Sequence, residues 1–288
     1  MSNWDIQDKR VIITGGTSGI GLETAKALSQ LGAEVSITSR SLDSAKITAE
    51  SIQQHTGNPV TGFELNLESM DSVRAFAKNF DKQKIDILIN NAGMIAGKKR
   101  ITEDGFEATF AANYLGPFLL TDLLMPSLKK SKQARVINAS SELYRNAKSG
   151  LNFDDLQLTN SYSSSKAYAN SKLGLMLFTL ELRRRYLDDG IESFALHPGV
   201  IKTAFGTGPD SLRSMGLTMK LMGPLLKTPE HGAKTSILLA TESSKNLDSS
   251  WYWSETKPSD PKPFAIDEGV SERLWKATEE LLENSAKK

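Results

Sequence analysis

A phenol and an ammonium stand four residues apart in a helical pattern, at Tyr168 and Lys172. Residues with this spacing share one face of a helix, so both side chains are predicted to point toward one cleft. A free tyrosine has a pKa of about 10, which is too high for efficient proton exchange at neutral pH. A lysine ammonium about 4–5 Å away contributes about 3–4 kcal/mol at an effective dielectric constant of about 20. The pair is therefore predicted to lower the pKa of Tyr168 and to carry out acid–base catalysis.

A second tyrosine–lysine pair with the same spacing, Tyr162 and Lys166, lies six residues earlier. Six residues make about 1.7 helical turns, so the two pairs cannot face the same cleft. The helical apolar pattern continues downstream of Tyr168, whereas Tyr162 falls at the predicted beginning of the helix. We therefore expect Tyr168 to act in the chemistry and Tyr162 to have no part in it.

A glycine-rich turn near the start of the chain joins a β-branched strand to a helix. Its residues are Gly15, Thr17, Ser18, Gly19, Ile20 and Gly21. Glycines in such a turn adopt positive φ angles or let the backbone approach a phosphate without an obstructing Cβ. The helix that follows offers free N–H groups and its positive dipole end to an anion. The turn is predicted to hold the pyrophosphate of a dinucleotide, with a purely structural turn as the alternative.

The end of the second predicted strand indicates which dinucleotide binds. An acidic residue there bonds a ribose 2′-hydroxyl, whereas a basic residue accommodates a 2′-phosphate. This chain has Arg40 at that position, between two serines and with no carboxylate. One charged hydrogen bond of about 1.5–3 kcal/mol predicts a preference of about ten- to a hundredfold for NADP(H). A solvated surface arginine is the alternative.

Composition bounds the class of protein. The chain has 288 residues, a net charge of +1 and no cysteine. The balanced charge gives no argument for a nucleic-acid partner, and the lack of cysteine excludes disulfides and thiolate metal sites. No metal-ligand spacing occurs. Residues 1–10 are polar, and no run approaches the roughly eighteen apolar residues of a membrane span, so we expect a cytoplasmic protein without a transmembrane anchor.

Strand-like and helix-like segments alternate along most of the chain. Strands are predicted at residues 10–14, 34–38, 60–65, 85–89, 135–139 and 191–196, with a seventh candidate near 251–253. Helices are predicted at residues 20–31, 41–54, 69–80, 102–128 and 162–186. This alternation predicts an α/β fold, a Rossmann-type doubly wound parallel sheet in a three-layer α/β/α arrangement. No linker divides the chain, so residues 1–288 are predicted to form a single domain.

Three segments depart from the alternation. Residues 141–160 are polar and are predicted to form a loop. Residues 204–227 are rich in methionine and leucine, which favours a helical lid over an apolar pocket. A core helix and an amphipathic membrane contact are the alternatives for this segment. Residues 267–285 are predicted to form a C-terminal helical tail.

These motifs together resemble the short-chain dehydrogenase/reductase superfamily, and within it the retinol-dehydrogenase-like reductases. Fungal secondary-metabolite reductases show a similar pattern. The resemblance extends from about residue 10 to about residue 258. Its markers, in family order, are Thr14-Gly15-x-x-x-Gly19-Ile20-Gly21, Asn90-Asn91-Ala92-Gly93, Asn113, Ser140-Ser141, Tyr168-x-x-x-Lys172 and Pro198-Gly199-x-x-x-Thr203.

The resemblance implies a catalytic set of Ser141, Asn113, Tyr168 and Lys172. Ser141 would hold the substrate oxygen, and Ser140 would be a structural serine. Asn113 would distort its helix and hold a water that links Lys172 to solvent, with a buried, hydrogen-bonded asparagine as the alternative. The implied cofactor contacts also include Asn66, Leu67, Asn90, Ala92, Gly93, Tyr168, Lys172, Pro198, Gly199, Ile201 and Thr203.

Two further positions follow from the family pattern. Asn66 stands where the family usually has an aspartate that bonds the adenine amino group, so adenine binding is expected to be weaker. His197 occupies a position that shapes the nicotinamide pocket, and it is interpreted as structural.

The function expected from these residues is that of an NADP(H)-dependent carbonyl reductase or alcohol dehydrogenase. Its small-molecule partner would be a sizeable apolar carbonyl or alcohol, such as a steroid-, retinoid- or polyketide-like compound. Two alternatives stay open: non-redox chemistry (a dehydratase, epimerase or cyclase) and an NADPH-binding scaffold protein. Relatives often pair through their long helices, which makes a homo-oligomer a further expectation. Solvation of Arg183, Arg184, Arg185 and the C-terminal tail is the other interpretation.

Overall fold

The computed structural model describes residues 4–201, 226–247 and 250–285. Eight strands form one sheet with the order β3-β2-β1-β4-β5-β6-β7-β8, and every neighbouring pair is parallel except β7 and β8. The predicted doubly wound α/β fold is confirmed. The strands are β1 (Arg10–Ile13), β2 (Glu34–Ser39), β3 (Val60–Glu64), β4 (Ile87–Asn90), β5 (Ala134–Ala139), β6 (Ile191–His197), β7 (Tyr252–Ser254) and β8 (Lys257–Pro258).

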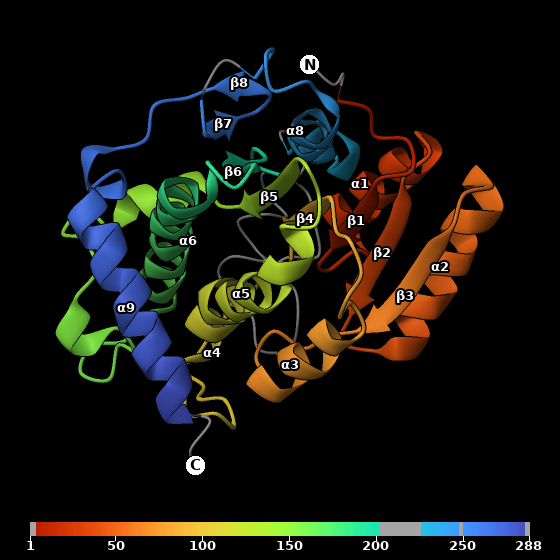
Figure 1. The fold of residues 1–288 in the computed structure, drawn as a ribbon. Helices are drawn as coiled ribbons and strands as arrows, with labels where there is room; N and C mark the ends of the chain where they lie inside the picture. Colours follow the sequence, from red (N-terminus) through yellow and green to blue (C-terminus); the bar gives the residue numbers. More distant parts are fainter. Residues whose placement is uncertain (1–3, 202–225, 248–249, 286–288) are drawn as a thin grey trace.

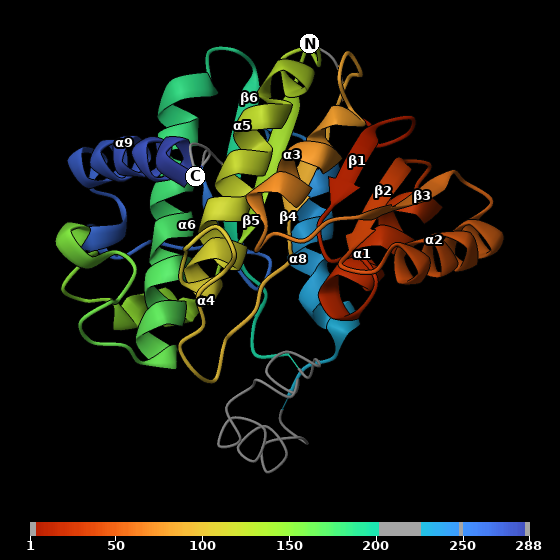
Figure 2. The same ribbon diagram turned by 90° about the horizontal axis from the view of Figure 1, so that it is seen from below.

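Helices cover both faces of this sheet (Figures 1 and 2). Helices α3 and α5 lie on one side of the strands, and α1, α2 and α8 lie on the other. The α-helices are α1 (Gly19–Gln30), α2 (Leu42–Thr56), α3 (Met70–Lys78), α4 (Ala108–Phe110), α5 (Gly116–Leu128), α6 (Ser164–Tyr186), α8 (Pro229–Thr241) and α9 (Glu268–Ser285). Shorter turns are the π-helix η1 (Ala111–Leu115) and the 3-10 helices η2 (Glu142–Asn146), η3 (Phe153–Asp155) and η5 (Pro263–Ala265).

Each face of the sheet has its own apolar core. One cluster packs side chains of α3, α5, α6 and α9 against the sheet, and the other packs those of α1, α2 and α8. Strand β4 (Ile87–Asn90) is buried along its whole length, as expected for a parallel strand covered on both faces. The two cores hold the strands at a fixed register, so the residues that follow their carboxyl ends are held there as well.

The prediction of a single helix over residues 102–128 is wrong. Residues 102–107 form a turn that contains Gly105 at φ +85°, and Glu107 then caps the helix by accepting bonds from the N–H groups of Thr109 and Phe110. The helix continues as α4, the π-helix η1 and α5. Single π turns occur mostly inside α-helices, and all five residues of η1 are buried, so the apolar sequence pattern did not reveal this turn.

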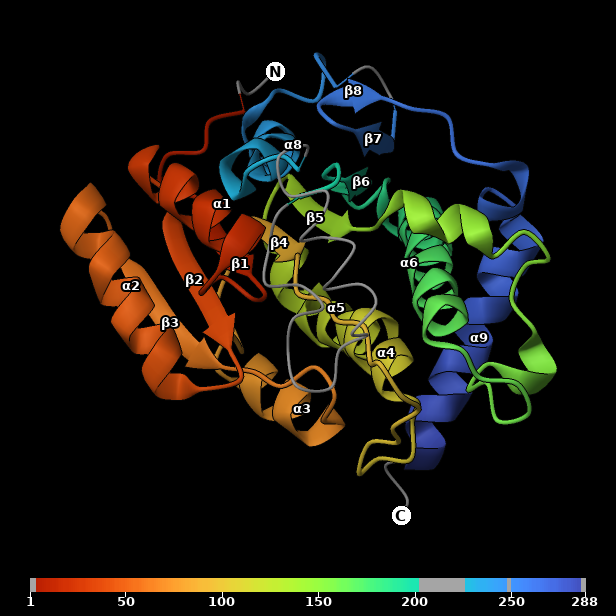
Figure 3. The ribbon, with the colours of Figure 1, turned by 180° about the vertical axis from the view of Figure 1, so that it is seen from behind.

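The C-terminal tail is a folded part of the molecule. Helix α9 lies side by side with α6 (Figures 1 and 3). Trp275 of α9 packs between Phe118 of α5 and Phe178 of α6, with ring centroids 4.7 and 5.7 Å away. One face of this helix is therefore buried in the core, and its opposite face, which includes Lys276, is exposed.

Three further outcomes concern membrane spans, the predicted lid and two elements that the sequence did not predict. Among the described helices, none is long and apolar enough to cross a bilayer. The predicted lid at residues 204–227 lies outside the described residues, apart from its last two positions. Helix α8 and strand β8 lie where the sequence analysis predicted no element.

Candidate active site

The glycine-rich turn lies between β1 and α1, at the carboxyl edge of the sheet. Gly15 and Gly19 have φ angles of +66° and +54°, which L side chains rarely adopt. Gly21 is needed for a different reason. A Cβ on Gly21 would lie 2.3 Å from the carbonyl oxygen of Gly15 and 2.5 Å from Nδ2 of Asn91. The backbone can close into this turn because these positions carry no side chain.

Asn91 holds the turn, although the sequence analysis assigned it no role of its own. Its Nδ2 donates to the carbonyl oxygens of Thr14 and Gly15, at 2.9 and 3.4 Å. The Thr14 hydroxyl oxygen in turn accepts from the N–H groups of Asn91 and Ala92, both at 3.0 Å. The Asn-Asn-Ala-Gly motif after β4 therefore braces the glycine-rich turn after β1, and its second asparagine is the main brace.

The beginning of α1 suits an anion. Ser18 is the N-cap residue, but its side chain makes no capping hydrogen bond. By contrast, α2, α3, α6 and α8 are each capped by the serine or threonine at that position. The first N–H groups of α1 are thus available above a turn that has no obstructing Cβ, which fits the pyrophosphate of a dinucleotide.

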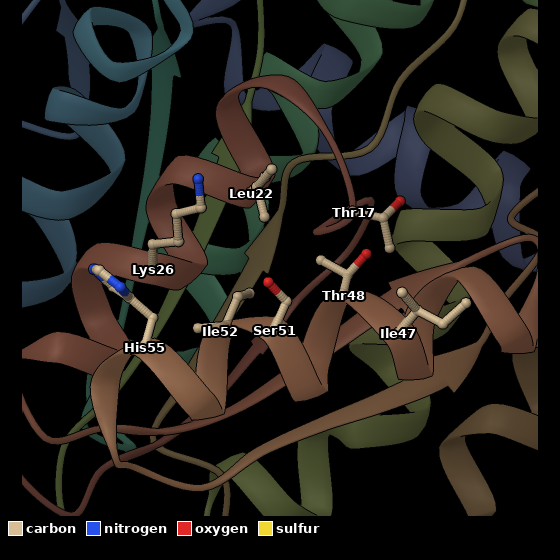
Figure 4. A pocket seen from close by; sticks show the side chains of 8 residues that line it. All are labelled: Thr17, Leu22, Lys26, Ile47, Thr48, Ser51, Ile52 and His55. Atoms are coloured by element: carbon tan, nitrogen blue, oxygen red, sulfur yellow. The ribbon is translucent and has the colours of Figure 1, made fainter.

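A surface pocket of about 490 Å³ lies beside this turn, between α1 and α2 (Figure 4). Figure 4 shows the side chains of Thr48 and Ser51 pointing from α2 toward α1. The residues that line it are Thr17, Leu22, Lys26, Ile47, Thr48, Ser51, Ile52 and His55. None of these residues comes from β5 or α6, so Ser141, Tyr168 and Lys172 do not line this pocket.

The residues expected at the adenosine end lie at the same edge of the sheet. Arg40 is exposed directly after β2, next to Ser41, which caps α2. Asn66 and Leu67 follow β3. The Asn66 side-chain oxygen accepts from the N–H of Glu68 at 3.1 Å, so part of its hydrogen-bonding capacity is used locally.

Tyr168, Lys172 and Ser141 lie together at the carboxyl end of β5. Tyr168 and Lys172 are buried on α6, with the ammonium 5.6 Å from the centroid of the phenol ring. The Lys172 ammonium donates to the carbonyl oxygen of Ala139 at 2.7 Å. Ser141 makes a side-chain hydrogen bond with Tyr168. The structure thus brings together a phenol, an ammonium and a hydroxyl from two elements, as a proton-transfer site requires.

The pKa values of this pair differ from the prediction. Burial raises the pKa of Tyr168 to about 12, and the hydrogen bond with Ser141 only partly opposes this effect. Burial also lowers the pKa of Lys172 to about 8. The prediction that Lys172 lowers the pKa of Tyr168 is therefore wrong for the protein on its own. It counted the attraction between the two groups and left out the cost of burying each of them.

The structure separates the two serines and the two tyrosines. The Ser140 hydroxyl donates to the carbonyl oxygen of Lys172 at 3.1 Å and so ties β5 to α6. Tyr162 precedes α6, and its hydroxyl lies 3.4 Å from the carbonyl oxygens of Ala96 and Lys98. Its partner Lys166 is exposed and donates to Ser161 at 3.1 Å. Tyr162 and Lys166 thus lie outside the buried cluster.

This geometry agrees with comparisons to known proteins. The sequence matches the family described as short chain dehydrogenase over residues 9–210. The chain belongs to the short-chain dehydrogenase family. Retinol dehydrogenase 13 of Homo sapiens is 38% identical over 96% of this chain and 85% of that protein. Retinol dehydrogenase 12 of Bos taurus is 39% identical over 95% of this chain and 86% of that protein.

A solved structure supports the same assignment. The crystal structure of an uncharacterized protein from Mycobacterium Paratuberculosis is 30% identical and covers 97% of this chain and 95% of its own, with a TM-score of 0.74. The resemblance to retinol-dehydrogenase-like members of the family is confirmed. The chain is an enzyme of this family, and its cofactor is a nicotinamide dinucleotide.

In this dehydrogenase, Asn113 lies within the π-helix η1. Its side chain accepts from the N–H of Met94 at 2.7 Å and donates to the Met94 carbonyl oxygen at 2.9 Å. It also donates to the hydroxyl of Ser171 at 3.0 Å. Since Ser171 directly precedes Lys172 on α6, this bond ties η1 to α6 next to Lys172.

Most of the remaining predicted cofactor residues of the dehydrogenase lie at one edge of the sheet. Ala92, Gly93, Pro198, Gly199 and Ile201 follow the carboxyl ends of β4 and β6, at the same edge as the glycine-rich turn. The Asn90 side chain instead points into the core, where Nδ2 donates to Asn138 at 2.8 Å and to Thr121 at 3.1 Å. Thr203 lies outside the described residues.

Proposed function

We propose that this dehydrogenase interconverts an apolar carbonyl compound and its alcohol with NADP(H). The arrangement of Ser141, Tyr168 and Lys172 carries the proposal, because it places a proton donor and an oxygen-binding hydroxyl in one buried site. The names of the retinol dehydrogenases similar to this chain support an apolar alcohol or aldehyde as the substrate. The bound nicotinamide would supply or accept the hydride.

The protein side of the chemistry is a proton transfer. Tyr168 is protonated at neutral pH, since its pKa is raised to about 12, so it can donate a proton to a substrate oxygen. The Ser141 hydroxyl, which already bonds the phenol, would hold that oxygen as negative charge develops on it. The Lys172 ammonium would offset the negative charge left on the phenol. In the reverse reaction, the phenolate would accept the proton of the alcohol.

The choice of NADP(H) rests on Arg40. This exposed guanidinium follows β2, where a ribose 2′-phosphate would lie, and the next residue, Ser41, caps α2. A planar guanidinium pairs well with phosphate. The glycine-rich turn, the uncapped beginning of α1 and Arg40 would together hold the phosphates of the cofactor.

Two exposed apolar side chains support an apolar substrate. Leu143 is 43% exposed and lies two residues after Ser141. Val200 is 61% exposed and follows Gly199. Exposed aliphatic side chains on both segments next to the catalytic residues would favour a hydrocarbon substrate by the hydrophobic effect.

The proposal can be tested with the purified protein and a panel of apolar aldehydes and ketones, including retinoid- and steroid-like members. NADPH consumption is followed at the nicotinamide absorbance while the product is quantified. We expect one NADPH oxidised for each alcohol formed, and little activity with small polar carbonyl compounds. Conversion of substrate without net oxidation of NADPH would contradict the proposal and would favour a non-redox enzyme.

A further inference from the structure

The imidazole of His197 connects two segments of the active site. His197 is the last residue of β6, directly before Pro198, and it is only 9% exposed. Its Nδ1 accepts a hydrogen bond from the N–H of Glu142 at 3.3 Å. Because Glu142 directly follows Ser141, the ring of a β6 residue contacts the backbone next to the proposed oxygen-binding hydroxyl.

This N–H group needs a partner from outside its own turn. Ser141 caps the 3-10 helix η2, and its hydroxyl oxygen accepts from the N–H of Leu143 at 3.2 Å. The N–H of Glu142, at the first position of η2, is one of the donors that a helix cannot satisfy internally. The imidazole of His197 supplies the acceptor, and so completes the cap of the turn that carries Ser141.

The backbone of His197 is anchored on the other side. Its carbonyl oxygen accepts from the N–H of Glu255 at 3.1 Å. Glu255 and Thr256 form the two-residue turn between β7 and β8, with φ angles of +50° and +70°. The Glu255 carboxylate pairs with Lys227 and lies against Gly199, where an added Cβ would be 2.9 Å from Oε1. The strand end at His197 is therefore held firmly where the segment from Pro198 to Ile201 begins.

We propose that His197 is a positioning residue for catalysis. As a neutral ring with the proton on Nε2, it would hold the Ser141 turn in register with the Pro198–Gly199 segment. The Nδ1 atom can accept the N–H of Glu142 only when it carries no proton. Charging of the ring would place two donors against each other and displace Ser141 from Tyr168. This inference rests on the proposed function for its effect on turnover, but not for the state of the ring itself.

The surroundings of the ring favour its neutral form. Four charged side chains act on it: Glu142 and Arg145 from η2, and Glu255 and Lys227 from the side of the β7–β8 turn. Each carboxylate pairs with the cation on its own side. Burial is the largest influence, and it lowers the pKa of His197. The ring would thus take up a proton only below the ordinary histidine value of about 6.5.

The state of the ring can be measured without any turnover. The chain has three histidines, so nitrogen-15 labelling of histidine gives three pairs of ring nitrogen signals, and a His197→Asn variant assigns one pair by its loss. We expect His197 to carry its proton on Nε2 at pH 7 and to titrate below the ordinary histidine value of about 6.5. A proton on Nδ1, or a charged ring at pH 7, would overturn the inference whether or not the protein turns over a carbonyl substrate.

Turnover tests the consequence for catalysis. Asparagine keeps an acceptor oxygen near the position of Nδ1 and does not titrate, whereas leucine offers none. We expect His197→Leu to lower kcat by about tenfold or more, with less than about a threefold change in the KM for NADPH. We expect kcat of the wild type to decline at acidic pH as His197 takes up a proton. The His197→Asn variant should retain most of kcat and should not show this decline.

The control is His55→Asn, an exposed position separate from the catalytic cluster, which should keep the acidic decline. If His197→Asn and His55→Asn show the same acidic decline, His197 is not its source and the inference fails. If His197→Leu does not fold, as judged by circular dichroism, the asparagine variant and the ring titration still decide the question. A wild type that binds no NADPH would contradict the proposed function and would leave the titration result standing.

Discussion

At the scale of single residues, the active site places two buried ionisable side chains four residues apart on one helix, Tyr168 and Lys172. Burial raises the pKa of the phenol to about 12 and lowers that of the ammonium to about 8. Each side chain therefore resists its charged form. The phenol is kept as a proton donor, and the ammonium remains charged at neutral pH with little margin.

This arrangement predicts that the Lys172 ammonium lowers the stability of the fold while it is needed for turnover. The folded-state pKa of about 8 lies below the unfolded value of 10.5. Below pH 8 the buried charge of Lys172 therefore lowers the free energy of unfolding. This loss of stability disappears as the pH rises toward 10.5. We expect Lys172→Met to raise the free energy of unfolding by about 1–2 kcal/mol at pH 7, after the lost bond to Ala139, and to abolish turnover.

Urea unfolding at pH 7 and at pH 9.5 measures this effect. The difference in the free energy of unfolding between Lys172→Met and the wild type should be smaller at pH 9.5. The exposed Lys129→Met serves as a control, since it removes a charge from the surface at no cost of burial. A Lys172→Met variant that is less stable than the wild type at pH 7 would show that the ammonium stabilises the fold.

Arg40 gives a second prediction at this scale. If its guanidinium binds the 2′-phosphate, Arg40→Ala should raise the Kd for NADPH by about ten- to a hundredfold and leave the Kd for NADH nearly unchanged. Fluorescence titration with both cofactors measures the two constants. Equal losses for NADPH and NADH would mean that Arg40 does not contact the 2′-phosphate.

Tyr168 was preferred over Tyr162 from the sequence because Tyr162 falls at the predicted beginning of the helix and the apolar pattern continues after Tyr168. The structure buries Tyr168 and exposes Lys166, the lysine that is paired by spacing with Tyr162. The directions in which the pKa values of Tyr168 and Lys172 shift could not be predicted from the sequence, because the cost of burial depends on the atoms that surround each group. The contact of His197 with Glu142 joins residues 55 positions apart, and no spacing rule predicts it.

At the scale of the elements, α6 carries Tyr168 and Lys172 and packs against two neighbouring elements. The π-helix η1 reaches it through the bond from Asn113 to Ser171, and α9 covers its outer side. The Tyr114 hydroxyl of η1 bonds that of Thr278 of α9 at 2.7 Å. The three elements form one packed unit behind Tyr168 and Lys172.

The packing of α9 predicts a large effect at Trp275. This ring is buried against Phe118 and Phe178, and Arg185 lies 4.4 Å from its centroid. We expect Trp275→Ala to lower the free energy of unfolding by about 3–5 kcal/mol. Lys276→Ala, on the exposed face of the same helix, should stay within about 0.5 kcal/mol of the wild type. Urea unfolding measures both, and similar values for the two variants would mean that α9 does not dock as described.

The boundaries of elements were less predictable than their existence. The turn at residues 102–107 depends on Gly105 and on the cap from Glu107, which interrupt an otherwise helical apolar pattern. The docking of α9 depends on aromatic side chains from α5 and α6, more than ninety positions away along the chain. Its apolar stripe indicated a helix but could not indicate what that helix covers.

At the scale of the whole molecule, the parallel sheet brings the site together. Strands β1, β4, β5 and β6 are neighbours, so the segments after their carboxyl ends meet at one edge. The glycine-rich turn, the Asn91 brace, Ser141 and the Pro198–Gly199 segment come from these four positions. The alternation of strands and helices was enough to predict this meeting, because parallel strands with crossover helices leave one edge for all the carboxyl ends.

The central claim is that Tyr168 donates the proton to the substrate oxygen. The most direct test compares the wild type with Tyr168→Phe and Tyr162→Phe in NADPH-dependent reduction of an apolar aldehyde, with NADPH binding and thermal unfolding measured on each. We predict that Tyr168→Phe lowers kcat by about 10²–10⁴-fold while it still binds NADPH, and that Tyr162→Phe retains most of kcat. Substantial turnover by Tyr168→Phe, with a loss in Tyr162→Phe, would contradict the account.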